Sequence, residues 1–429
     1  MDAGRDMKLL ISTYACAPDH GSEQAVGWNW TTAAHRLGHE VWAMASTAHR
    51  SAIEAACRKD KDLAGINWIF PEIPAWSLRP GIEPIWERTY NLLWQCAALR
   101  HARALERQIP LDAIHHLTWG GVRAPTFLGS LRAPLIVGPI GGGETSPMAL
   151  RDGLTARSRT IERIRDLSNA SITVNPITRV GLAQAKVIFV KTPDTQRILT
   201  AAMQRKSRTF LELTLQRSQL GSPRGPRRGP PRLLYAGRLL YWKGVHIAVR
   251  ALAQLLPQMP EARLTIVGKG PEGERLKAEA VGMNLGDRIE FIPWLPQQHL
   301  FALYGNHDLF VFPSLHDSSG NVVLEALSHG LPVMCLDLGG PRQIVTSQSG
   351  IVVGTSGRDA NGVAAAIADE INALFADPAR VAALSSGALA RAAEFVVSDR
   401  IAAFYRAAEE AIGLAAHPAS PRAALSYAP

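Results

Sequence analysis

The sequence of 429 residues is poor in cysteine and has no long apolar run free of charges. Its four cysteines, Cys16, Cys57, Cys96 and Cys335, are far apart and include no C-x-x-C pair, so we expect neither a disulfide framework nor a metal cluster. No run of about twenty apolar residues is present to span a bilayer, and a strand pattern begins at residue 7 without a preceding signal-peptide pattern. We therefore expect a cytoplasmic protein.

Charged residues make up 19% and hydrophobic residues 47% of the chain, which indicates a globular α/β protein and excludes a disordered one. The length predicts two domains. The net charge of +9 favours acidic partners, namely sugar nucleotides, an anionic membrane surface or nucleic acid. Because the sequence has no zinc-finger spacing, RNP-like segment or basic–aromatic groove, we do not expect nucleic acid.

The second half of the chain is built around residues 311–335. Their pattern is an apolar strand, a polar loop at 317–321, a helix at 322–328 and a second strand. In a parallel sheet such a loop lies at the ligand-binding edge, and the first amides of the helix form an anion site. Asp317 is then placed to accept hydrogen bonds from a sugar, residues 319–322 to hold phosphate oxygens, and Glu325 to hold ribose hydroxyls. The alternative is an ordinary helix N-cap followed by a solvated glutamate.

A strand at 233–236 leads into a loop that carries Arg238 and Lys243. Arginine offers a planar fork of donors and lysine a point charge, so together they can neutralise a diphosphate leaving group. The alternative is that both are solvated surface cations.

These two patterns resemble the G-R-x-x-x-x-K-G and E-x7-E motifs of the retaining GT-B glycosyltransferases of family 4, with Asp317 in place of the first glutamate. The resemblance implies an α/β protein of the GT-B fold: two Rossmann-like domains whose parallel sheets face a cleft, with the donor on the second domain and the acceptor mainly on the first. It implies catalytic roles for Arg238, Lys243, Asp317 and His115. The candidate donor-binding residues are Gly21, Gly270, Trp294, Ser318, Ser319, Gly320, Asn321, Val322 and Glu325.

In the first half, the loop that contains Gly21 resembles the glycine-rich first loop of GT-B enzymes, although a plain turn glycine is the alternative. A strand at 112–118 carries His115 and His116, and His115 resembles the histidine of the family's D-x-x-H pattern. Adjacent strand residues point to opposite faces, so only one of the two is expected to enter the cleft.

A glycine-rich loop follows the next strand and is expected to open onto the same cleft. Its alternative is a flexible turn. The candidate acceptor-side residues are His116, Gly142, Gly143 and Glu144.

A segment rich in proline, glycine and arginine at 216–232 predicts an exposed linker. We place an acceptor-side domain at 1–215, a nucleotide-sugar domain at 233–397, and a helix at 398–416 that crosses back to the first domain, as the resemblance implies. Residues 417–429 are expected to form a disordered tail.

A helix with both aromatic and basic side chains is predicted at 82–108, including Trp86, Trp94, Arg100 and Arg103. Three arrangements are open for it: packing in the core, covering the acceptor cleft as a lid, or lying on an anionic membrane. With the basic net charge, the third arrangement predicts peripheral association with the inner face of a membrane.

The function that the resemblance implies is transfer, with retention, of a sugar from a nucleotide diphosphate sugar to a glycan or lipid-linked acceptor, in cell-envelope or exopolysaccharide synthesis. No metal cofactor is expected, because Arg238 and Lys243 supply the positive charge. Two alternatives remain open: a GT-B-shaped isomerase or epimerase of the sugar nucleotide, and a protein that binds it without catalysis.

Overall fold

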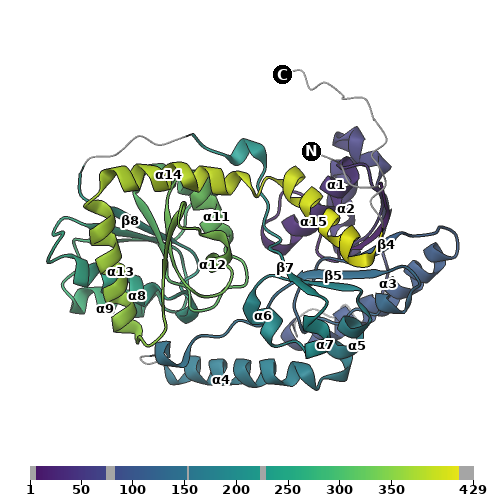
Figure 1. Ribbon diagram of the computed structural model, residues 1–429, viewed down its shortest axis with the longest axis horizontal. Helices are drawn as coiled ribbons and strands as arrows, with labels where there is room; N and C mark the ends of the chain where they lie inside the picture. Colours follow the sequence, from purple (N-terminus) through teal and green to yellow (C-terminus); the bar gives the residue numbers. More distant parts are fainter. Residues whose placement is uncertain (1–5, 74–82, 152–153, 223–228, 415–429) are drawn as a thin grey trace.

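The computed structural model describes residues 6–73, 83–151, 154–222 and 229–414 of the chain (Figure 1). These residues form two parallel β-sheets, one from each half of the sequence. This arrangement confirms the predicted α/β class. The tail predicted at 417–429 and part of the predicted linker lie outside the described residues.

The first sheet has seven strands in the order β3-β2-β1-β4-β5-β6-β7. Its strands are β1 (Lys8–Ser12), β2 (Glu40–Met44), β3 (Asn67–Ile69), β4 (Ala113–His116), β5 (Leu135–Ile140), β6 (Val187–Val190) and β7 (Ser207–Thr209). The α-helices of this half are α1 (Ser22–Arg36), α2 (Arg50–Lys59), α3 (Glu83–Glu106), α4 (Ala156–Ala170), α5 (Pro176–Gln184), α6 (Pro193–Arg197) and α7 (Ala201–Gln204).

Both faces of this sheet are covered, which explains the continuous apolar run of β1. Leu10 packs with Trp42 on one face, whereas Leu9 and Ile11 pack into a separate cluster on the other face. A strand buried on both sides has no solvent face and therefore no alternation of polar and apolar residues.

The second sheet has six strands in the order β10-β9-β8-β11-β12-β13. Its strands are β8 (Arg232–Ala236), β9 (Arg263–Val267), β10 (Ile289–Ile292), β11 (Leu309–Phe312), β12 (Val333–Leu336) and β13 (Gly350–Val353). Its α-helices are α8 (Val245–Leu255), α9 (Gly273–Gly282), α10 (Gln297–Asn306), α11 (Asn321–Ser328), α12 (Pro341–Ile344), α13 (Ala360–Phe375) and α14 (Pro378–Ala393).

The last described helix, α15 (Val397–Ile412), follows the second sheet in sequence but packs against the first one (Figure 1). The ring centroid of its Phe404 lies 4.7 Å from the ring centroid of Trp30 in α1. The two chain crossings between the halves are bonded to each other: the Leu215 amide donates to the Phe395 carbonyl at 2.8 Å, and the Val397 amide to the Leu215 carbonyl at 2.9 Å. The two crossing segments of the chain therefore lie side by side.

The side chains of α3 are described from residue 90 onward, and there the helix is packed in the core. Trp94, Ala98 and Ala102 are buried with the first sheet. Among the described helices, none combines the length and the apolar character needed to cross a membrane.

Candidate active site

Loops at the carboxyl ends of both sheets line one pocket of about 590 Å³, which we call the interdomain pocket. Strand order reverses between β1 and β4 in the first sheet and between β8 and β11 in the second. The start of α1, which follows β1, and the loops after β4, β8 and β11 contribute to the lining. Open parallel sheets bind ligands at such reversal points. The lining includes Glu23, Lys191, Glu212, Arg238, Lys243, Asp317 and residues 319–322.

The loop after β11 brings the start of α11 to this pocket. Gly320, with φ of +113°, caps the helix, and Asn321 begins it. A Cβ atom on Gly340 would lie 2.3 Å from the Ser319 carbonyl oxygen, so the neighbouring loop packs tightly against this one. The first N–H groups of α11 have no partner within the helix, and together with the helix dipole they form an anion site at the pocket.

Arg238 and Lys243 reach the same pocket from the loop after β8. Lys243 Nζ forms an ion pair with Asp317 Oδ2. Arg238 is exposed. The structure thus brings together the two predicted diphosphate-binding cations and the first carboxylate of the motif, and their catalytic roles remain predictions.

The turn that places Lys243 depends on the glycine that follows it. Lys243 ends a short 3-10 helix, η8 (Tyr241–Lys243), and Gly244 adopts a left-handed conformation with φ of +67°. A Cβ atom at this position would lie 1.9 Å from the Pro313 carbonyl oxygen at the end of β11. Only glycine therefore fits between the loop after β8 and the loop after β11. We call these two the donor-side loops, after their predicted role.

The first domain adds an ion pair to the pocket that the sequence analysis missed. Lys191 Nζ lies 2.6 Å from Glu212 Oε1, and Ser319 of the second domain donates to the same oxygen at 2.6 Å. Burial by itself lowers the pKa of Lys191. The attraction of the Glu212 carboxylate is stronger, so the net effect is a pKa raised above its usual value. Within the described chain, Glu212 Oε2 has no hydrogen-bond partner. The signal was available, because Lys191 directly follows β6 and Glu212 lies shortly after β7.

Glu23 in the first turn of α1 was also missed. It lines the interdomain pocket, and its Oε1 accepts a hydrogen bond from the Gly120 amide at 2.9 Å. The neighbouring Gly21, a candidate donor-binding residue, is exposed and is not among the lining residues. The predicted loop therefore reaches the pocket through its glutamate.

Glu144, a candidate acceptor-side residue, connects the two domains. Its carboxylate is buried and accepts a hydrogen bond from Ser318 of the second domain at 2.5 Å. Thr192 and Thr195 of the first domain donate to its other oxygen. Burial raises the pKa of Glu144, but the bonds from Ser318 and Thr192 prevail and lower it. Glu144 thus holds the loop after β11 against the first domain.

A second buried carboxylate, Glu162 of α4, bonds to both donor-side loops. Its Oε1 accepts from Tyr241 Oη at 2.6 Å and lies 3.0 Å from His316 Nε2. Tyr241 precedes Lys243 by two residues, and His316 precedes Asp317 directly. Burial alone raises the pKa of Glu162, but the bond from His316, followed by that from Tyr241, lowers it to about 2.

Glu325 lies on α11 and is not among the lining residues of the interdomain pocket. Its carboxylate accepts hydrogen bonds from Tyr304 Oη at 3.3 Å and Gln297 Nε2 at 3.4 Å. Burial raises its pKa. Its predicted bonds to ribose hydroxyls remain a prediction.

In the parts of the chain that the structure describes, no group of three or more His, Cys, Asp or Glu side chains is arranged to hold a metal ion.

The family model for glycosyl transferases group 1 matches residues 220–390. This segment contains the loop with Arg238 and Lys243 as well as residues 317–325. A glycogen synthase of Mycobacterium tuberculosis is 38% identical over 145 residues, which cover 34% of this chain and 34% of that protein. A D-inositol 3-phosphate glycosyltransferase of Catenulispora acidiphila is 37% identical over 191 residues, or 42% of this chain and 44% of that protein. The chain thus spans less than half the length of these relatives.

Over nearly the whole chain, the structure is similar to that of a sucrose-phosphate synthase from Thermosynechococcus elongatus. The TM-score is 0.61 at 17% identity, and the alignment covers 95% of this chain and 100% of that one. This similarity, with the two parallel sheets, confirms the predicted GT-B fold.

In this GT-B fold, the expectation that one of the two β4 histidines enters the cleft is wrong. His115 is fully buried, with its ring nitrogens bonded to Tyr405 Oη at 3.0 Å and the Gly138 carbonyl at 2.7 Å. His116 points to the opposite face and is also buried. Burial lowers the pKa of each to about 4. The return of α15 covers the face of His115, so the structure does not support a catalytic role for it.

The remaining candidates are not among the residues that line the interdomain pocket. Gly142 has φ of +105°, and a Cβ on Gly143 would lie 2.5 Å from Thr195 Cα, so both shape the loop before Glu144. Gly270 packs against the Leu239 backbone. Trp294 is 67% exposed, and neither it nor Gly270 is among the residues that line the interdomain pocket.

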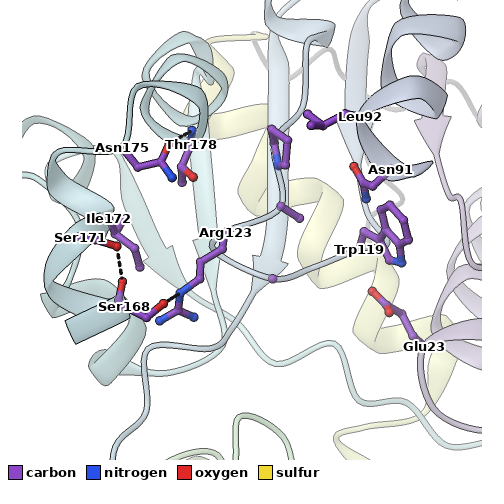
Figure 2. Close-up of a pocket in the computed structure, with 13 residues that line it drawn as sticks. Glu23, Asn91, Leu92, Trp119, Arg123, Ser168, Ser171, Ile172, Asn175 and Thr178 are labelled. Carbon is purple, nitrogen blue, oxygen red and sulfur yellow. Dashed lines mark hydrogen bonds between the residues drawn. The ribbon is translucent and has the colours of Figure 1, made fainter. Parts of the chain in front are cut away.

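A second pocket, of about 550 Å³, lies in the first domain and shares Glu23 and Gly121 with the interdomain pocket. Figure 2 shows its two walls, with Trp119, Asn91 and Glu23 on one side and Arg123 with residues of α4 and α5 on the other. We call it the first-domain pocket. Because the two pockets share lining residues, a molecule in one lies next to a molecule in the other.

The walls of the first-domain pocket combine an aromatic face with polar groups. Trp119 packs against Tyr14, with ring centroids 4.3 Å apart. Asn91 is 5% exposed, and its Oδ1 has no hydrogen-bond partner in the described chain. Arg123 donates to Ser168 Oγ at 2.7 Å and is held on the opposite wall. An aromatic ring beside amide and guanidinium groups suits a polyhydroxylated ligand.

Proposed function

We propose that the chain is a glycosyltransferase that holds a nucleotide diphosphate sugar in the interdomain pocket and a hydroxyl-bearing acceptor in the first-domain pocket. One observation carries the proposal: Arg238, Lys243 and the N-terminus of α11 converge on one pocket. All three lie in the segment that matches glycosyl transferases group 1. The shared lining of the two pockets supports the placement of the acceptor.

In this reaction the acceptor oxygen bonds to the anomeric carbon as the bond from that carbon to the diphosphate breaks. The acceptor proton goes to the departing diphosphate oxygen. Arg238, Lys243 and the α11 amides stabilise the charge that develops on the diphosphate. Lys243 exchanges its contact with Asp317 for one with phosphate, and Asp317 then accepts a hydrogen bond from the transferred sugar.

Transfer proceeds with retention of the anomeric configuration, a proposal supported by the resemblance of residues 317–325 to the E-x7-E motif. The acceptor is a glycan or a lipid-linked saccharide of cell-envelope or exopolysaccharide synthesis. The hydrogen bonds of Glu144 and Glu162 hold the two domains together and exclude water from the interdomain pocket, where it would otherwise hydrolyse the donor.

The test is a thermal-shift screen against a panel of nucleotide diphosphate sugars, because a ligand at a hundred times its Kd stabilises the fold by about 2.7 kcal/mol. The donor identified in this way is then incubated with glycan and lipid-linked acceptors in EDTA. We expect transfer to persist in EDTA, since the two cations neutralise the leaving group.

Three outcomes contradict parts of this proposal. If no sugar nucleotide stabilises the fold, the whole proposal is wrong. An epimer formed from the donor alone, without transfer, favours the isomerase. Loss of transfer on chelation, with recovery in Mg²⁺ or Mn²⁺, shows that a metal supplies charge that we assign to Arg238 and Lys243.

A further inference from the structure

The large apolar side chains that remain exposed in the described residues are concentrated in one segment. Residues 148–180 carry Met148, Ile161, Ile164, Leu167, Val174 and Val180, whereas the rest of the described chain contributes Val281, Met283 and Trp294. Ile164 is 62%, Leu167 73% and Val174 70% exposed. Exposed apolar groups gathered in this way mark an interaction surface.

The geometry of α4 explains why this surface faces outward. Glu162, Ser158 and Asn169 form the buried stripe of the helix, and Glu162 bonds to the second domain. At about 100° per residue, Ile164 and Leu167 fall on the opposite side. Figure 1 shows α4 along the outer edge of the molecule. The helix is therefore amphipathic in the unusual sense that its polar stripe is inside and its apolar stripe outside.

The outer surface is also basic. Arg157, Arg159, Arg163 and Arg179 are exposed, and none of them forms an ion pair within the described residues. The acidic residues of α4 are paired or buried instead: Asp166 forms an ion pair with Arg151 at 2.6 Å, and Glu162 is buried. An apolar stripe with a border of unpaired cations is complementary to an anionic lipid surface.

The same segment forms a wall of the first-domain pocket. Ser168, Ser171, Ile172, Asn175 and Thr178 line this pocket (Figure 2) and alternate with the exposed apolar residues. A lipid bilayer held against the outer side of the segment is thus separated from the pocket only by this wall. A symmetric contact with a second copy would instead bring like-charged arginines together, which is unfavourable.

We propose that the α4–α5 surface, defined by Ile161, Ile164, Leu167, Val174 and Val180, docks on an anionic lipid bilayer and presents the first-domain pocket to a lipid-linked acceptor. The acceptor part rests on the function proposed above, whereas the docking part does not. The surface differs from the one predicted from the sequence, which placed the membrane on the helix at 82–108. From residue 90 onward, α3 has exposed arginines but no exposed large apolar side chain.

The test is sedimentation of the full chain with vesicles of phosphatidylcholine alone or with phosphatidylglycerol, at low and high salt. We expect binding to the anionic vesicles at low salt, weakened as salt rises. Ile164→Glu with Leu167→Glu should lower this binding at least tenfold. Arg157→Glu, Arg163→Glu and Arg179→Glu together should also lower it, since each cation near the surface contributes about fivefold, the equivalent of about 1 kcal/mol.

The matched control is Val281→Glu with Met283→Glu, which alters exposed apolar residues of the second domain and should leave binding unchanged. A second comparison is Arg100→Glu and Arg103→Glu on α3 together with Arg107→Glu directly after it. Greater loss of binding in this variant than in the α4 variants overturns the assignment, as does no binding of the wild type. A dimer in sedimentation velocity that Ile164→Glu dissociates identifies a second copy as the occupant instead.

The thermal-shift response to the sugar nucleotide is measured on the same variants. Vesicle binding without any donor response overturns the proposed transfer and leaves the docking surface standing. A donor response without vesicle binding overturns the docking surface alone. All the substituted side chains are exposed, so unfolding temperatures near that of the wild type are expected and are recorded for each variant.

Discussion

Arg238 and Lys243 have different surroundings although they lie on one loop. Arg238 is exposed, whereas Lys243 is held by Asp317 and lies 5.3 Å from the ring centroid of Phe312. A guanidinium brings a fork of donors and an ammonium a single mobile charge, so the two are not interchangeable at a diphosphate. We therefore expect each to contribute separately to stabilising the leaving group.

The residue-scale prediction is that Arg238→Ala and Lys243→Ala each lower turnover by roughly 10²–10³, the effect of removing one preorganised charge-stabilising donor. Turnover is measured with the donor found in the screen. Lys186→Ala is the control, because this exposed lysine precedes β6 at the opposite end of that strand from Lys191. Wild-type turnover in both loop variants would exclude their role in leaving-group stabilisation.

At the scale of elements, α4 contacts loops of the second domain that are distant from it in sequence. Its inner side carries Glu162, which holds the loops before Lys243 and Asp317, and its outer side carries Ile164 and Leu167. One helix thus contacts the donor-side loops and forms part of the proposed lipid surface. A change in the inner contacts is expected to loosen both donor-side loops together.

We predict that Glu162→Gln weakens donor binding by about tenfold and lowers the free energy of unfolding by roughly 1–3 kcal/mol, because buried donors lose a charged acceptor. Donor Kd and chemical denaturation are measured in parallel. Asp166→Asn is the matched control: it lies on the same helix and bonds to Arg151 in the first domain. Equal loss of donor affinity in both variants would indicate a general effect of α4 on stability, rather than positioning of the loops.

Over the whole molecule, buried histidines tie stability to pH. Burial lowers the pKa of His39, His115 and His116 to about 4 and that of His246 to about 3, from a usual value of 6.5. The unfolded chain therefore takes up protons at a higher pH than the folded one. Wherever the unfolded state binds more protons, stability rises with pH, so stability is lost as pH falls from 6.5 towards 4.

The prediction is that the unfolding temperature is highest above pH 6.5 and falls steadily down to pH 4, with each histidine contributing at most about 1.4 kcal/mol per pH unit. Below pH 4.5 Glu162 adds to the loss, because its pKa is lowered to about 2 in the folded state. The pH dependence of the unfolding temperature is measured by thermal unfolding between pH 4 and 8. His39→Gln should make the slope shallower, and an unfolding temperature that stays constant from pH 6.5 to 4 would contradict the burial of neutral histidines.

The sequence by itself determined the fold class and much of the second domain's side of the pocket. Residues 311–335 predicted a strand, loop and helix, and the structure places β11 and α11 there, with the helix one residue earlier than expected. Such inferences succeed because a strand followed by a turn and a helix is specified locally, and the position of a loop at a strand's carboxyl end follows from parallel topology.

Tertiary structure decided which side chains from distant segments meet. His115 ends a strand as expected, but α15 returns from residues 397–412 and buries it, which no spacing around His115 reveals. Lys191 and Glu212 contact Ser319, which is more than 100 residues away in sequence, and Glu162 contacts Tyr241 and His316, which are 79 and 154 residues away. The apolar stripe of α4 is outside for the same reason, because its polar stripe is bonded inward, with Glu162 on His316 of the second domain and Asn169 on Gly143 of the first. A periodic pattern identifies two sides of a helix, and only its packing partners decide which side is buried.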